Sequence, residues 1–108
     1  MNVRDAGDLL DVMRPEISSI LRNLTVYMGD DMPTCTSQSL RARRAVEWLD
    51  ERMKESKLGM GQWFELNRHR SRLKDFLAVH RTVTMLERMH ANTADFSNPE
   101  RDWMLMSG

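Results

Sequence analysis

The longest uninterrupted helical pattern of the chain lies in residues 62–91, QWFELNRHRSRLKDFLAVHRTVTMLERMHA, which contain neither proline nor glycine. Six side chains recur in this stretch at alternating intervals of three and four residues: Leu66, His69, Leu73, Phe76, His80 and Val83. This spacing places them on one face of an α-helix. The helix would extend about 45 Å, whereas a compact domain of this chain length is only about 35 Å across. We therefore expect the helix either to break or to project far enough to meet a partner.

An amphipathic helix is predicted over residues 5–28. Its apolar side chains follow a heptad-like spacing: Ala6, Leu10, Met13, Ile17, Ile20, Leu24 and Tyr27. Pro15 lies about 160° from this stripe, so it can bend the helix on the solvent side without breaking it. The alternative is a new helix that begins at Pro15. Gly29 is expected to supply the C-terminal cap.

A second helix is predicted over residues 37–57, with Thr36 or Ser37 as its N-cap. Its apolar stripe consists of small and medium-sized side chains: Ala42, Ala45, Val46, Leu49 and Met53. On the solvent side, Arg43 with Glu47 and Asp50 with Lys54 are spaced as i,i+4 ion pairs. Gly59 and Gly61 then separate this helix from the long one.

The end of the chain is expected to contain a polar break over residues 92–98. A short helix over residues 99–106 follows, since Asn98 and Pro99 suit the N-cap and the first helical position. No segment alternates with a period of two residues, so no strand is predicted. The predicted fold class is all-α, a small bundle of three main amphipathic helices plus a short C-terminal helix, in a single helical domain of residues 1–108.

Composition and charge exclude several classes of protein. The chain has 16 basic and 16 acidic residues and a net charge of zero, which differs from the overall basicity of a dedicated nucleic-acid binder. No apolar run approaches the roughly 18 residues of a transmembrane helix, and the N-terminal residues lack the pattern of a signal peptide. Cys35 is the sole cysteine, so no internal disulfide can form. We expect a cytoplasmic protein without membrane contact.

The sequence contains no recognisable catalytic, cofactor or metal site. His69 and His80 share a helix face but lie about 16 Å apart along it, too far for one metal ion whose ligand bonds are about 2 Å long. No GxSxG, HExxH, CxxC or glycine-rich phosphate loop occurs. We therefore expect no enzymatic activity, no cofactor and no bound metal.

Two basic segments, residues 41–44 and 68–74, support an alternative function as a nucleic-acid-binding regulator. The candidate residues are Arg41, Arg43, Arg44, Arg68, Arg70 and Arg72. In a helix, Arg68 and Arg72 fall on one flank of the apolar stripe and Arg70 falls on the other. A surface that follows phosphates needs its charges on one face, so this distribution favours solvated edges of a packed helix.

Two short segments resemble DNA-binding motifs. Residues 59–62, GMGQ, resemble the turn of a lambda-repressor-type helix-turn-helix, which implies a small residue where Glu55 stands and an apolar one where Glu65 stands. Residues 63–70, WFELNRHR, are similar to the recognition helix of homeodomains, but the additional Leu66 rotates Asn67 by about 100° from the base-reading position. Neither resemblance assigns a family.

The function that the pattern favours is a non-enzymatic protein-protein interaction module, such as a small adaptor, inhibitor, chaperone-like or regulatory protein that acts through helix packing. The partner is another protein, and we also expect a homodimer that shares the stripe of residues 66–86, because two shorter helices leave part of the longest one exposed. The candidate partner-binding residues are apolar and adaptable: Trp103, Met104, Leu105, Met106, Met85 and Met89.

Overall fold

The computed structural model describes residues 2–32, 37–55 and 57–96, and every regular element in these ranges is helical. Helix α1 spans Val3–Met28 and is followed by the 3-10 turn η1, Gly29–Asp31. Helix α2 spans Gln38–Met53, and helix α3 spans Met60–Phe96. The predicted all-α class is therefore confirmed. The short helix predicted over residues 99–106 lies outside the described residues.

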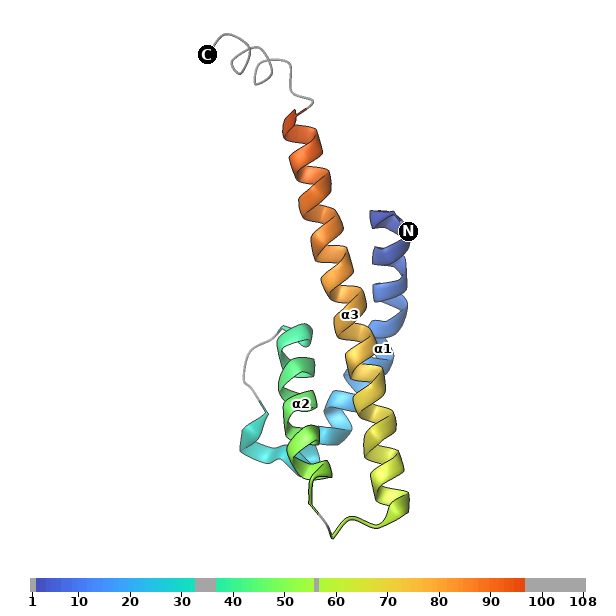
Figure 1. Cartoon of the computed structure of the whole chain (residues 1–108), viewed down its shortest axis with the longest axis vertical. Coiled ribbons are helices and arrows are strands. Elements are labelled where there is room, and N and C mark those ends of the chain that lie inside the picture. The colour runs from blue at the N-terminus through green and yellow to red at the C-terminus, as the bar shows by residue number, and fades with distance from the viewer. Residues whose placement is uncertain (1, 33–36, 56, 97–108) are drawn as a thin grey trace.

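Helix α3 is the axis of the molecule, and α1 and α2 both run antiparallel to it (Figure 1). Helix α2 lies beside the first half of α3 only, and the C-terminal end of α3 extends beyond both of the other helices (Figure 1). The molecule measures 68 × 25 × 22 Å, and its radius of gyration is 19.5 Å, against about 13 Å for a compact domain of similar length. The 37 residues of α3 span about 55 Å. Of the two outcomes expected from the sequence, the long helix projects and does not break.

Helix α1 continues through Pro15 as one element, and Figure 1 shows that it bends near its middle. The prediction of one bent helix, and not two, is confirmed. The side chain of Gln38, at the start of α2, contacts this region: its Nε2 donates to the carbonyl oxygen of Arg14 at 2.9 Å and to Oγ of Ser18 at 2.8 Å. Gln38 thereby ties the start of α2 to the middle of α1.

The helix caps follow the sequence closely. Asn2 caps α1, since its Oδ1 accepts the backbone N–H of Asp5 at 2.9 Å. Gly29 ends α1 with a φ of 54°, a conformation that glycine adopts at little cost. Ser37 caps α2, because its Oγ accepts the backbone N–H of Leu40. The predicted caps at Gly29 and Ser37 are both confirmed.

One core connects the three helices, and its largest fully buried side chains are Phe76, Ile17, Leu21, Leu24, Leu49 and Leu73. The prediction that Tyr27 belongs to the stripe of α1 is wrong, because 69% of this residue is exposed while Leu21 and Met28 are buried. A heptad repeat drifts by about 20° per heptad against a straight α-helix. Over the three heptads from Ala6 to Tyr27 the stripe therefore moves by about 60°, and the later positions pass to Leu21 and Met28.

The predicted boundaries of α2 and α3 differ from those in the structure. Helix α2 ends at Met53 and not at residue 57, because the backbone N–H of Glu55 turns back to the carbonyl of Arg52. Helix α3 begins at Met60 and continues to Phe96, through most of the break predicted over residues 92–98. The residues involved, NTADF, include no proline or glycine that would stop a helix.

The predicted pairs on the solvent side of α2 are also different in the structure. Glu47 pairs with Arg44 at 3.5 Å instead of Arg43, and Lys54 pairs with Glu51 at 3.6 Å. Asp50 is bound by Arg70 of α3. A carboxylate predicted to stabilise one helix thus connects two helices.

Candidate protein-binding surface

The first half of α3 is used for packing within the chain. Leu73 and Phe76 are fully buried in the core shared with α1 and α2. On one flank Nε of Arg70 binds Oδ1 of Asp50 in α2, and on the other Nε of Arg72 lies 3.3 Å from Oε1 of Glu16 in α1. The predicted split of the basic residues between two flanks is confirmed. The stripe of residues 66–86, expected to be shared in a homodimer, is instead covered largely by helices of the same chain.

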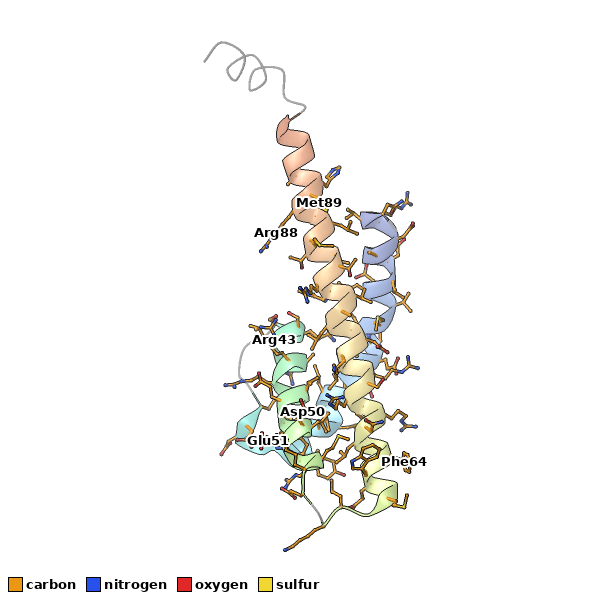
Figure 2. The ribbon with its side chains drawn as sticks, viewed as in Figure 1. Arg43, Asp50, Glu51, Phe64, Arg88 and Met89 are labelled. Carbon is orange, nitrogen blue, oxygen red and sulfur yellow. The ribbon has the colours of Figure 1, made fainter. Side chains whose placement is uncertain are left out.

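The second half of α3 packs less against the other helices toward its C-terminal end. All residues from 87 to 91 are exposed, and the predicted contact residues Met85 and Met89 have exposed fractions of 54% and 57%. Figure 2 shows Met89 well above the start of α2, near the level of the N-terminal end of α1. Two of the six predicted partner-binding residues, Met85 and Met89, are therefore exposed on the second half of α3. The other four, Trp103 to Met106, lie outside the described residues.

An open groove of about 620 Å³ lies where α2 begins beside α3; we call it the α2–α3 groove. It exists because α2 starts at Gln38, partway along α3, so that the side of α3 facing α2 continues beyond it. Its apolar lining comes from Leu40, Leu77 and Met85. Its basic lining comes from Arg43 of α2 and from Arg81 and Arg88 of α3. Arg43 and Arg88 lie on the same side of α3 in Figure 2.

Five of the described arginines are ion-paired, and the three arginines of the groove are among those that are not. Arg14, Arg44, Arg52, Arg70 and Arg72 each form an ion pair with a carboxylate. Within the described ranges, Arg43, Arg81 and Arg88 have no carboxylate within ion-pair distance, and no Asp or Glu lines the groove. Three guanidinium groups beside exposed apolar side chains form a surface suited to a partner of opposite charge.

The arginines predicted for nucleic-acid binding are not brought together. Arg41 lines a different groove, between α1 and α2, and its Nε is buried without a hydrogen-bond partner in the described part of the chain. Arg44, Arg70 and Arg72 are ion-paired, Arg43 lines the α2–α3 groove and Arg68 is exposed. Helices α2 and α3 lie side by side (Figure 1) and do not cross as the two helices of a helix-turn-helix do.

An exposed aromatic cluster, which the sequence reasoning missed, occupies the other end of α3. It consists of Met60, Trp63 and Phe64, and we call it the basal patch. The Trp63 and Phe64 rings meet edge to face with centroids 5.5 Å apart, and 59% of Phe64 is exposed. Figure 2 shows Phe64 near the start of the helix, far from Met89. The available signal was the position of Phe64, which precedes Leu66 by two residues and therefore lies about 160° around the helix from the core stripe.

Two of the three histidines lie close to side chains of their own helix. Nε2 of His69 lies 4.0 Å from Oε1 of Glu65, and the ring of His80 is 6.2 Å from that of Phe76. Where the structure describes the chain, no three His, Cys, Asp or Glu side chains gather as a metal site would require. Cys35 lies outside the described residues.

The chain was compared with known proteins. No protein-family model, curated protein or solved structure matches it. Of the helices in the described ranges, none combines the length and the apolar character needed to cross a bilayer.

Proposed function

We propose that this chain is a non-enzymatic protein-protein interaction module, a small cytoplasmic adaptor, inhibitor, chaperone-like or regulatory protein that binds its partner through α3. The observation that carries the proposal is the exposure of residues 87–91 near the C-terminal end of α3, together with the exposed side chains of Met85 and Met89. A helix gains most of its stability from packing of its apolar side chains. The projecting segment therefore gains stability when another protein covers it.

The energetics of such a contact are favourable. Burying one Met side chain contributes about 1.5–3 kcal/mol, and its unbranched thioether adapts to partners of different shape. The segment is already helical through Phe96, so binding does not have to order its backbone, which would cost about 1–2 kcal/mol per residue. A preformed helix that carries adaptable side chains is a suitable recognition element.

The proposal includes a homodimer, and the basal patch is the surface that supports it. Met60, Trp63 and Phe64 are exposed together at one end of the molecule. Aromatic and Met side chains are enriched at the centres of interfaces, and a two-fold contact requires only that one patch complement itself. The stripe of residues 66–86 is largely occupied within the chain, so the basal patch replaces it in this role.

A site-specific photo-cross-linking experiment tests the interaction. The full-length chain with a photoreactive residue in place of Met89 should cross-link one discrete protein in a cytoplasmic extract. The same residue in place of exposed Asp30, in η1, serves as the control and should not. Equal patterns at the two positions would contradict the proposal that α3 is the binding element.

Sedimentation equilibrium tests the dimer. We expect the wild-type chain to sediment above its monomer mass of 12.7 kDa at micromolar concentration, and Phe64→Glu to return it to that mass. A wild-type chain that is monomeric at every concentration would remove the homodimer from the proposal.

A further inference from the structure

The position of the α2–α3 groove suggests what shape it accepts. Helix α2 packs against one side of α3, and beyond its first residue, Gln38, the same side continues through Leu77, Arg81 and Arg88. A helix placed there would continue the packing of α2 along α3. From residue 77 to residue 91 the available length is about 21 Å, or roughly 14 helical residues. Leu40 and Met85, with exposed fractions of 48% and 54%, would pack against it.

The charges of the groove indicate what chemistry it accepts. Arg81 and Arg88 are seven residues apart, so they share one face of α3 about 10 Å apart. Arg43 approaches from α2, and within the described residues none of the three is ion-paired. The first turn of α2 also lines the groove, and the dipole of that helix adds positive potential at its N-terminal end. The surface complements carboxylates about two helical turns apart with apolar residues between them.

We infer that the α2–α3 groove binds an acidic amphipathic helix of a partner protein. The inference rests on the proposed function, since it names the chemistry of the partner that α3 binds. The apolar lining favours a peptide over nucleic acid, because a phosphate backbone has no apolar group to cover Leu40, Leu77 and Met85. The guanidinium groups supply specificity and faster association, and the apolar side chains supply burial.

A second copy of the chain is a weaker candidate for this groove. Exposed Asp5 and Asp8 accompany exposed Leu9 and Val12 on α1, which makes that face acidic and apolar. The N-terminal half of α1, however, lies on the other side of α3 from α2 (Figure 1). Contacts between surfaces on opposite sides of a molecule build open chains of copies and do not close around a two-fold axis.

The probe is a labelled synthetic helix of about 18 residues, with two glutamates seven residues apart and two leucines between them; the control peptide has lysines in place of the glutamates. Fluorescence anisotropy with the full-length chain should show binding of the glutamate peptide that weakens with added salt.

Arg81→Glu/Arg88→Glu should lower the affinity for the glutamate peptide by at least about tenfold, whereas Arg81→Lys/Arg88→Lys should keep most of that affinity. Arg4→Glu/Arg22→Glu, which makes the same charge change on exposed positions of α1, should stay within about twofold of wild type. Circular dichroism should show all variants equally helical.

Four outcomes would overturn the inference. Equal binding of the glutamate and lysine peptides would show that charge does not select the partner. Peptide binding that appears only after deletion of residues 97–108 would assign the groove to the chain's own C-terminal segment. Displacement of the peptide by a labelled RNA or DNA oligonucleotide of higher affinity would assign it to nucleic acid. Cross-linking at position 89 with no peptide binding would refute this inference alone and leave the proposed function standing.

Discussion

The two halves of α3 contain the same kinds of residue but use them differently. In the first half, Phe76 is buried, and Arg70 and Arg72 bind carboxylates of α2 and α1. In the second half, Met85 and Met89 are exposed, and Arg81 and Arg88 line an open groove to which no described residue contributes an acidic side chain. The difference follows from the length of α2, which covers only the first half. Whether an arginine of α3 stabilises the fold or is available to a partner depends on its neighbour and not on its own helix.

Truncation of one apolar residue in each half should give the largest contrast. Phe76→Ala removes a fully buried ring from the core and should lower the free energy of unfolding by about 3–5 kcal/mol. Met89→Ala removes an exposed side chain and should change the free energy of unfolding by less than about 0.5 kcal/mol. Urea denaturation monitored by circular dichroism measures both. Comparable losses in the two variants would mean that the two halves are equally buried in solution.

Truncation of the Gln38 side chain tests which contacts hold the start of α2, and with it the point along α3 where the cover by α2 ends. Its amide donates two hydrogen bonds to α1, to the carbonyl of Arg14 and to Ser18 Oγ, and these hold the start of α2. Gln38→Ala should cost about 1–2 kcal/mol, at about 1 kcal/mol for each hydrogen bond. The neighbouring Ser39→Ala, with no hydrogen bond to α1 or α3 in the described residues, is the control. An effect of Gln38→Ala no larger than that of the control would show that other contacts position α2.

Neutralising one arginine from each half should give the smallest effect on stability. Arg70→Met breaks a partly exposed ion pair with Asp50, and solvent screening limits the expected loss to about 0.5–1 kcal/mol. Arg81→Met breaks no ion pair that the structure describes and should be neutral within about 0.3 kcal/mol. Thermal unfolding at low and high salt distinguishes the two variants, because only the loss of stability in Arg70→Met should become smaller as salt is added. An Arg81→Met variant that is clearly less stable would place that residue in the fold.

The parts of the molecule that depend on local periodicity could be predicted from the sequence. The buried faces of α1, α2 and α3 and the caps at Gly29 and Ser37 follow from spacing and residue type alone. Tyr27 was misplaced because a heptad pattern drifts against a straight helix, and the end of α3 was misplaced because a polar stretch without proline or glycine remained helical.

The candidate site could not be predicted in the same way. The α2–α3 groove combines Arg43 with Arg81 and Arg88, and their proximity depends on where α2 begins along α3. The arginines that form visible clusters in the sequence, such as Arg68, Arg70 and Arg72, are neighbours in the chain, and helical spacing already predicts that they lie on different flanks of one helix. Met85 and Met89 are exposed, and their role as partner-binding residues remains a prediction.

Amide hydrogen exchange along α3 of the full-length chain tests the difference between its halves most directly. Exchange of buried helices requires extensive unfolding, while exposed helix ends open locally at little cost. We expect the amides of residues 70–77 to exchange as slowly as the core of α1, and those of residues 87–91 to exchange faster by at least about tenfold at concentrations where the chain is monomeric. Equally slow exchange in both segments of the monomer would show that the second half of α3 is already covered within the chain, and would contradict its role as a binding surface.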